Sequence, residues 1–313
     1  MKILILGAGG IGGYYGGRLA HAGVDVTFLV RPRRREQLAR DGLVIQSPKG
    51  DLRIPAKAIE ARESAPGYDY VLFTCKAYDL DSAMDAIAPA VDAKTAIVPM
   101  LNGLAHLERL DARFGAARVM GGTAHINVML KPDGTIWHGD ALQAMWFGER
   151  NRERSPRALA LDEATKRAGI DGGLSEDIER DMWEKIVFLS ALAATTCLFR
   201  GNVREIVGAP GGREAMVRAV EANRAIATAE GHAPRPQAIE RALQRLTDPE
   251  GLWSASMLRD LEGGGQVEAD HIVGWMLERA RRHAIDDAIL SFAYTHLKAV
   301  SYTHLTLPTI LRV

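Results

Sequence analysis

Three glycines near the N-terminus have the spacing of a dinucleotide-binding loop. The uncharged run at residues 3–6 predicts a strand buried on both faces, and G-x-G-x-x-G follows it directly. Gly7 would permit the tight turn, Gly9 would let the backbone approach a pyrophosphate, and Gly12 would let the next helix pack against the strand. Free N–H groups at the start of that helix would bind the phosphates. A purely structural glycine turn is the alternative. The predicted contacts are Gly7, Ala8, Gly9, Gly10, Ile11 and Gly12.

The end of the second predicted strand, residues 26–30, indicates which dinucleotide is preferred. An NAD site usually carries an acidic residue there, to bind the ribose 2′-hydroxyl. Here the strand runs into Arg31-Pro-Arg-Arg-Arg35, and Glu36 comes only after four arginines. Because guanidinium groups suit a 2′-phosphate, we expect NADPH rather than NADH, with Arg31 as the main phosphate ligand. A solvated, basic start of a helix is the alternative interpretation.

Polar residues follow two further predicted strands. Lys76 lies just past the strand at residues 68–74, where ligands bind in open parallel sheets. It would reach the cofactor or an anionic substrate, or it would be an ordinary solvated loop lysine. Asn102-Gly103 follows the strand at residues 95–101. It would place an amide near the nicotinamide end of a cofactor, or it would be only a turn.

One lysine stands at the start of an unusually apolar helix. The pattern predicts a helix over residues 178–199, and residues 186–199 include no charged side chain. Lys185 directly precedes this run. Desolvation there would lower its pKa or require a partner, although a lysine that extends to the surface is the simpler alternative. Further along, Gly263-Gly-Gly265 separates two predicted helices, and Glu268 falls in the first turn of the second, residues 267–283.

Composition excludes several classes of protein. The chain has 313 residues, 47% of them hydrophobic and 25% charged, with a net charge of zero. Zero net charge predicts no affinity for nucleic acid or an anionic membrane. Cys75 and Cys197 form no disulfide or metal pattern, and His125 and His138 are not spaced as metal ligands. We therefore expect a cytoplasmic protein without a metal site.

Strand and helix patterns predict two domains of different class. Strands alternate with helices up to about residue 155, including hairpins around Pro48-Lys-Gly-Asp51 and Pro132-Asp-Gly134. The second hairpin would extend the parallel sheet. Helices alone follow. The expected architecture is an α/β Rossmann-type dinucleotide-binding domain at 1–155 and an all-α domain at 156–300, which would bind substrate and mediate a homodimer. Tyr294-Thr-His-Leu297 recurs at Tyr302, so residues 301–313 are expected to be a foreign, weakly packed tail; a real terminal element is the alternative.

Seven motifs in this order resemble the ketopantoate reductase (2-dehydropantoate 2-reductase) family. The resemblance runs from residue 1 to about 300. Its motifs are Gly7-Ala-Gly-Gly-Ile-Gly12, Arg31, Thr74-Cys-Lys76, Asn102-Gly103, Trp183-Glu-Lys185, Ser256-Met-Leu-Arg-Asp260 and Glu268-Ala-Asp270. The resemblance implies an NADPH-dependent reduction of a 2-oxo acid and a place in pantothenate biosynthesis.

The resemblance also implies roles for individual residues. Lys185 would be the general acid that protonates the developing alkoxide. Asn102 would hydrogen-bond near the reacting centre, and Glu268 would bind the cofactor ribose or orient the lysine. The implied cofactor contacts outside the glycine loop are Arg31, Lys76, Asn102, Ile126 and Glu268. The implied substrate contacts are Lys185, Leu189, Ala193 and Ser256.

The substrate side departs from the family pattern. Family members that act on ketopantoate carry asparagines where this chain has Leu189 and Ala193, and a third asparagine falls on Val203 beside Asn202. An apolar wall does not select for a hydroxyl as an amide does. The substrate is therefore expected to be another 2-oxo acid, or a ketone or imine that is more apolar. A non-enzymatic NADPH sensor is the third hypothesis, and the four retained polar residues argue against it.

Overall fold

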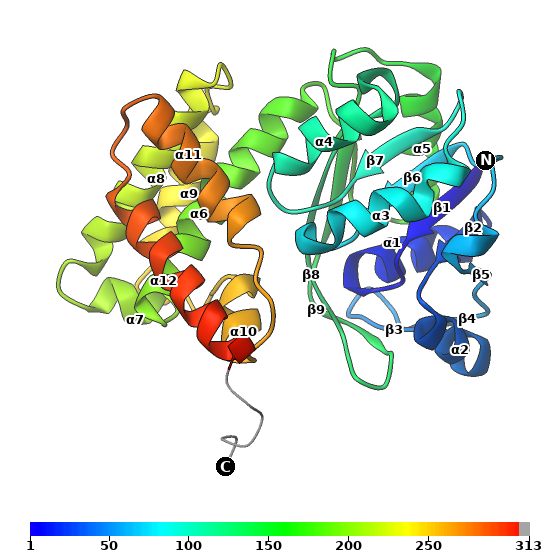
Figure 1. Ribbon diagram of the computed structural model, residues 1–313, viewed down its shortest axis with the longest axis horizontal. Helices are drawn as coiled ribbons and strands as arrows, with labels where there is room; N and C mark the ends of the chain where they lie inside the picture. Colours follow the sequence, from blue (N-terminus) through cyan, green and yellow to red (C-terminus); the bar gives the residue numbers. More distant parts are fainter. Residues whose placement is uncertain (307–313) are drawn as a thin grey trace. The chain divides into compact units, whose positions relative to one another are not determined.

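The computed structural model describes residues 1–306, and the chain divides into two compact units. The first comprises Met1–Leu101 and His106–Glu179, and the second comprises Asn102–Ala105 and the chain from Arg180 onward. Each unit is considered by itself. The first is α/β and the second is helical, in agreement with the expected fold class (Figure 1).

A parallel sheet of five strands forms the centre of the first unit. Ile3, Leu4 and Ile5 are fully buried, as expected for a strand covered on both faces. Each neighbouring pair in the sheet is parallel, and the strand order is β5-β2-β1-β6-β7. The strands are β1 (Lys2–Leu6), β2 (Asp25–Leu29), β5 (Ala58–Ile59), β6 (Tyr70–Phe73) and β7 (Ala96–Pro99).

Helices connect the strands of this sheet. They are α1 (Gly10–His21), α2 (Pro32–Asp41), α3 (Leu80–Ile87), α4 (Ala105–Phe114) and α5 (Pro156–Arg167), with short 3₁₀ turns η1 (Ala61–Glu63), η2 (Ala77–Asp79), η3 (Ala88–Ala90) and η4 (Ala116–Arg118). The parallel strands require such crossovers. α2 begins at Pro32, so Arg33, Arg34 and Arg35 lie inside the helix.

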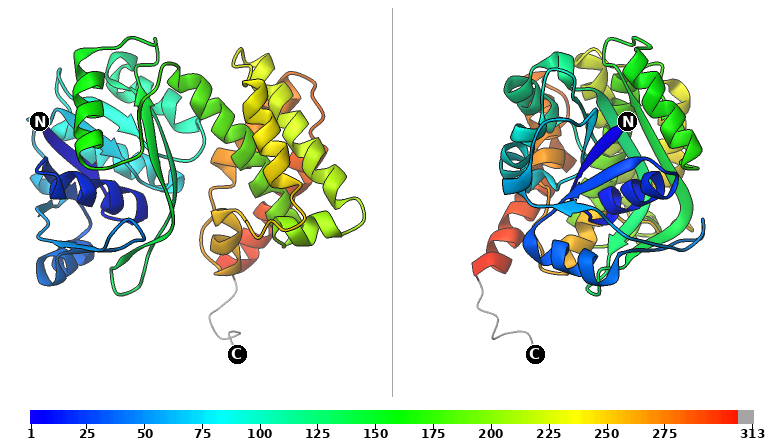
Figure 2. Two further views of the ribbon diagram at one scale, coloured as in Figure 1. Left: turned by 180° about the vertical axis from the view of Figure 1, so that it is seen from behind. Right: turned by 90° about the vertical axis from the view of Figure 1, so that its right-hand side faces the viewer.

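The two predicted hairpins belong to a second sheet. Its order is β10-β9-β3-β4, with β8 paired to β9, and Figure 2 shows β8 and β9 as long neighbouring strands. The expectation that the second hairpin extends the parallel sheet is therefore wrong. β9 pairs instead with β3 and β10, and these two strands use the backbone hydrogen-bonding groups on the edge of β9. The strands are β3 (Leu43–Gln46), β4 (Leu52–Ile54), β8 (Gly121–Leu130), β9 (Ile136–Gly148) and β10 (Gly172–Leu174).

The boundary between the units lies at Glu179, later than the expected residue 155. The reason is packing, because Ala158, Leu161 and Ala164 of α5 are fully buried in the core of the first unit. β10 adds a parallel strand to β9 of the same unit. Composition alone does not distinguish such a peripheral helix from the start of a helical domain.

The second unit is helical in the described part of the chain. Its elements are α6 (Ile178–Phe199), α7 (Val203–Gly208), α8 (Gly212–Ala229), α9 (Pro236–Leu246), α10 (Ser256–Glu262), η5 (Asp270–Gly274), α11 (Trp275–Arg282) and α12 (Ala288–Thr306). α6 is long and apolar enough to cross a membrane by length and composition, yet 67% of its most apolar window is buried inside the protein. It is a core helix. α12 continues to Thr306, and the remainder of the suspected tail, residues 307–313, lies outside the described residues.

Candidate active site

The glycine loop between β1 and α1 has the geometry of a phosphate-binding turn. Gly7 has a φ of +92°, which favours glycine, and its N–H donates to the Leu29 carbonyl at 2.9 Å. Gly9 is the N-cap of α1 and provides no side-chain cap, so N–H groups at this helix start have no side-chain acceptor there. Such a start favours an anion.

Gly12 and Gly9 are glycines for different physical reasons. A Cβ at Gly12 would lie 2.3 Å from both the Gly7 carbonyl oxygen and Thr74 Oγ1, so close packing of α1 on the sheet requires glycine there. A Cβ at Gly9 would meet no protein atom within 4 Å. Packing therefore does not demand glycine at position 9, whereas close approach of a pyrophosphate would. These residues fit a dinucleotide.

The other predicted loop contacts support the loop or border it. The Ala8 carbonyl accepts a hydrogen bond from Arg34 Nε at 3.0 Å. Gly10 begins α1, and Ile11 packs against the core cluster. Ile126 also packs there, at the point where the pairing of β8 with β9 shifts register.

Two predicted anion ligands stand at the carboxyl ends of strands beside β1. β2 and β6 flank β1 on opposite sides, so the direction in which strands are added to the sheet reverses at β1. Open parallel sheets bind ligands at the carboxyl ends of the strands beside such a reversal. Arg31 follows β2 and pairs with Asp79 of η2, at 2.9 Å between Nη2 and Oδ2. Lys76 follows β6, is exposed, and caps η2.

In the second unit, Lys185 is half-buried near the start of α6. Burial lowers its pKa to about 8, and the carboxylate of Glu268 partly offsets this effect because it favours the charged ammonium. Glu268 itself is only 7% exposed.

The Asn102 turn clusters with the same compact unit. Although it follows β7 in the chain, Asn102–Ala105 is grouped with Lys185 and Glu268. Gly103 has a φ of +83°, and a Cβ there would lie 2.7 Å from the His271 carbonyl oxygen. The turn therefore packs closely against η5. All three predicted catalytic residues belong to one unit.

Glu268 was expected in the first turn of a helix over residues 267–283, but it lies just before the helix. η5 is a π-helical turn that starts at Asp270, and the N–H of Gly274 donates to the Ala269 carbonyl five residues back, at 2.9 Å. The helix becomes regular only at Trp275. π-turns of this kind occur frequently at functional sites.

The substrate residues predicted on α6 share one helix face. Lys185, Leu189, Ala193 and Thr196 are spaced by three or four residues. Leu189 is half-buried, and Ala193 is 1% exposed. Thr196 Oγ1 accepts a hydrogen bond from the N–H of Ala255 at 3.4 Å, directly before Ser256 begins α10. This bond brings the start of α10 to the same face of α6.

The asparagine beside Val203 has a structural task. Asn202 caps α7, because its side chain accepts from the Glu205 N–H at 3.0 Å and its own N–H donates to Glu205 Oε2 at 2.8 Å. Val203 is fully buried. Neither residue offers an amide to a ligand at this face.

Two polar contacts near the predicted residues were missed in the sequence. Asp79 pairs with Arg31, and Arg235 clamps the first turns of α6 by donating to Glu184 Oε1 from its backbone N and its Nε, at 2.8 and 2.7 Å. The hydrogen bonds that Arg235 donates to the Glu184 carboxylate raise the pKa of Arg235. Both pairs join segments distant in sequence, and only the proline on each side of Arg235 signalled a fixed loop. By contrast, His138 is structural as expected, since its ring binds Ser47 Oγ at 2.8 Å and the Leu142 carbonyl at 3.0 Å.

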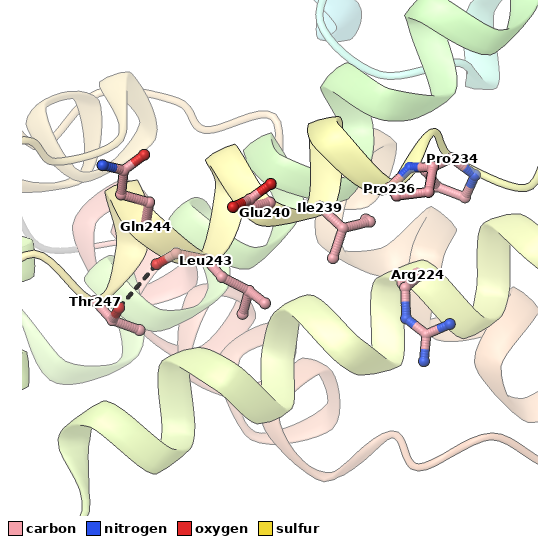
Figure 3. A pocket seen from close by; sticks show the side chains of 8 residues that line it. All are labelled: Arg224, Pro234, Pro236, Ile239, Glu240, Leu243, Gln244 and Thr247. Atoms are coloured by element: carbon pink, nitrogen blue, oxygen red, sulfur yellow. Dashed lines mark hydrogen bonds between the residues drawn. The ribbon is translucent and has the colours of Figure 1, made fainter.

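A cavity of about 710 Å³ opens between α8 and α9 (Figure 3). Its polar groups serve the helices themselves. Thr247 Oγ1 donates to the Leu243 carbonyl at 2.9 Å, and Arg224 pairs with Glu221. We assign it no part in catalysis. Its lining comprises Arg224, Pro234, Pro236, Ile239, Glu240, Leu243, Gln244 and Thr247.

Comparison with known proteins finds one family over both units. Residues 3–152 match the family model described as ketopantoate reductase PanE/ApbA, and residues 177–301 match its C-terminal model. An uncharacterized oxidoreductase of Bacillus subtilis, YkpB, is 37% identical over 298 residues, 95% of this chain and 98% of that protein. A 2-dehydropantoate 2-reductase of Mesorhizobium japonicum is 31% identical, over 90% of this chain and 92% of that protein.

Solved structures show the same fold. A 2-dehydropantoate 2-reductase from Geobacter metallireducens superimposes with a TM-score of 0.86 at 29% identity, over 96% of this chain and 99% of that chain. A D-mandelate dehydrogenase solved with NADH and anilino(oxo)acetate gives a TM-score of 0.86 over 98% of this chain and 100% of that chain. Its identity of 18% shows likeness of fold alone.

Proposed function

The chain belongs to the ketopantoate reductase family, and on that premise we propose that it reduces a 2-oxo acid to a 2-hydroxy acid with NADPH. The observation that carries the proposal is the position of Lys185, directly before the apolar run of the core helix α6, where burial lowers its pKa to about 8 and the carboxylate of Glu268 favours its charged form. An acid of this strength holds its proton at neutral pH and releases it readily. A protein that only sensed NADPH would not need such a group.

Lys185 is proposed as the proton donor. When bound, NADPH supplies a hydride to the carbonyl carbon of the oxo acid. The Lys185 ammonium then transfers a proton to the carbonyl oxygen as negative charge develops there, and its own charge stabilises that oxygen beforehand. Glu268 holds the lysine in its charged form. In the reverse reaction the neutral amine would accept the proton.

The remaining predicted residues are proposed to bind and orient. The glycine loop would hold the pyrophosphate, Arg31 the 2′-phosphate, and Lys76 an anionic group of cofactor or substrate. Ser256 would hydrogen-bond the substrate carboxylate from the start of α10. Asn102 would donate its amide near the reacting carbon.

A more apolar substrate than ketopantoate is favoured by the face of α6. That face carries Leu189 and Ala193 beyond the lysine, and Asn202 is used as a helix cap. A wall without hydrogen-bonding groups binds a methyl group no less tightly than a hydroxymethyl group. A ketone or imine reductase with an apolar substrate remains the alternative activity.

A pair of matched oxo acids tests the proposal. Ketopantoate and 3,3-dimethyl-2-oxobutanoate differ only by a hydroxyl, so the ratio of their kcat/KM values measures what the pocket does with that group. We expect NADPH oxidation with both, a ratio that does not favour ketopantoate, and loss of turnover in Lys185→Ala. Strong preference for ketopantoate would overturn the apolar assignment. Binding of NADPH without reduction of any oxo acid would overturn the proposed activity in favour of a sensor.

A further inference from the structure

The four arginines that follow β2 fall into two groups: two are held by hydrogen bonds or ion pairs within the fold, and two lie exposed at the surface. Arg34 donates to the Ala8 carbonyl at 3.0 Å and to the Gly134 carbonyl at 3.0 Å, so it braces the glycine loop against the second sheet. Arg35 pairs with Glu60 and Glu63 in a capped 3₁₀ turn. Neither guanidinium can turn to a ligand without breaking these bonds.

The other two arginines of the cluster lie on the surface. The side chain of Arg31 is 78% exposed. Arg33 is exposed too, and within residues 1–306 it makes no hydrogen bond or ion pair. These are the guanidinium groups that a phosphate can reach while the loop remains braced.

Arg31 already has an anionic partner within the same unit. Its Nη2 lies 2.9 Å from Oδ2 of Asp79, whose side chain is 34% exposed. Asp79 ends η2, and the Asp79 N–H donates to the Lys76 carbonyl at 3.0 Å, which fixes the carboxylate near the end of β6. The carboxylate therefore belongs to the turn that follows β6, whereas Arg31 follows β2 on the opposite side of β1.

We propose that Asp79 competes with the 2′-phosphate of the cofactor for Arg31, and so sets how strongly the chain prefers NADPH over NADH. This inference rests on the proposed function. A 2′-phosphate at Arg31 must displace the carboxylate and then remain near it, and both effects oppose binding. A 2′-hydroxyl meets neither cost. The preference for NADPH is therefore smaller than four arginines within residues 31–35 would suggest.

The size of the effect follows from exposure. An exposed ion pair contributes little, and the repulsion between a carboxylate and a nearby phosphate is screened by water and salt. Together they correspond to about a fivefold change in affinity, confined to nucleotides that carry the 2′-phosphate. The change should shrink as ionic strength rises.

Calorimetric titration with nucleotide fragments tests the inference without turnover. The probes are adenosine 2′,5′-bisphosphate and adenosine 5′-monophosphate, and the variant is Asp79→Asn. We expect the bisphosphate to bind about fivefold more tightly and the monophosphate to change less than twofold. Asp81→Asn is the matched control, because it removes an equal charge two residues away, where Asp81 pairs with Arg109. It should change neither affinity.

A double variant distinguishes a direct effect from a general one. In an Arg31→Gln background, Asp79→Asn should lose most of its gain, because the two residues act on each other. Equal gains for both fragments, or an unchanged ratio in Asp79→Asn, would overturn the inference. If Asp79→Asn binds the bisphosphate selectively more tightly but the protein reduces no oxo acid, the role of Asp79 is upheld and only the proposed reaction is overturned. Failure of both fragments to bind would overturn both.

Discussion

The proposed acid predicts a specific pH dependence of reduction. Burial lowers the pKa of Lys185 to about 8, from an ordinary lysine value of 10.5. Only the protonated amine can donate, so the rate of reduction should be constant at low pH and decline as pH rises through about 8. With that pKa, about nine-tenths of the lysine is charged at pH ~7 and about one-tenth at pH ~9. The hydride-transfer step should therefore slow about tenfold over this range.

Single-turnover measurement isolates the step from product release. Enzyme preloaded with NADPH would be mixed with excess oxo acid, and the loss of nicotinamide fluorescence followed at each pH. Lys185→Arg should abolish the decline, since arginine does not deprotonate in this range, although its rate will be low. Lys166→Arg is the control: this lysine pairs with Asp162 on the surface of α5, and its replacement should leave the profile unchanged.

The sign of the Glu268 effect provides the refutation. Its carboxylate raises the pKa of Lys185, so Glu268→Gln should lower that pKa and move the decline to lower pH. If Glu268 instead binds the cofactor ribose, the variant would raise the KM for NADPH and leave the decline in place. A decline that moves to higher pH, or a rate in the parent enzyme that does not fall between pH ~7 and ~9, would refute the assignment of Lys185 as the acid.

Three further predictions concern the fold and the pocket. Gly12→Ala should lower the free energy of unfolding, measured in urea, by about 1–3 kcal/mol, because its Cβ would meet the backbone of Gly7. Gly9→Ala should leave that free energy unchanged and weaken nucleotide binding. Equal stabilities of the two variants would contradict the packing role of Gly12. Arg235→Ala should lower the free energy of unfolding by about 1 kcal/mol, since it removes the guanidinium that contacts both Asp181 and Glu184 of α6, and Arg235→Lys should recover only part of the loss. A neutral Ala variant would contradict the clamp. Leu189→Asn should raise the kcat/KM ratio of ketopantoate to 3,3-dimethyl-2-oxobutanoate by about tenfold, and an unchanged ratio would place this residue outside the pocket.

The sequence was sufficient for the parts of the fold that local patterns determine. Uncharged strands such as residues 3–6, the glycine spacing, and the apolar run of α6 each specify burial directly. The helix predicted over residues 178–199 has the same bounds in the structure, where it is α6. These features are local, since period, turn chemistry and capping residues lie within a few positions of one another.

Features that depend on pairing distant segments were not accessible in the same way. The partner of β9 is β3, some ninety residues earlier in the chain, and no alternation pattern names it. The π-turn at Asp270 depends on which backbone hydrogen bonds form along the helix. Asp79 contacts Arg31 from η2, a turn that follows a different strand of the sheet. The candidate site was therefore predicted as a set of residues that includes Glu268, whereas the pairing of Asp79 with Arg31 required the structure.

With Lys185 as the proposed acid and Leu189 as a proposed substrate contact, acid strength and substrate preference should be coupled, because one helix supplies both residues. Desolvation is the main reason that the pKa of Lys185 is low, and Lys185 directly precedes the apolar run of α6. The same face carries Leu189, where an amide would bind a substrate hydroxyl. An asparagine there would also solvate the lysine better and raise its pKa. A change of specificity made on this face should consequently alter the pH profile of the reaction, and the two properties cannot be optimised separately.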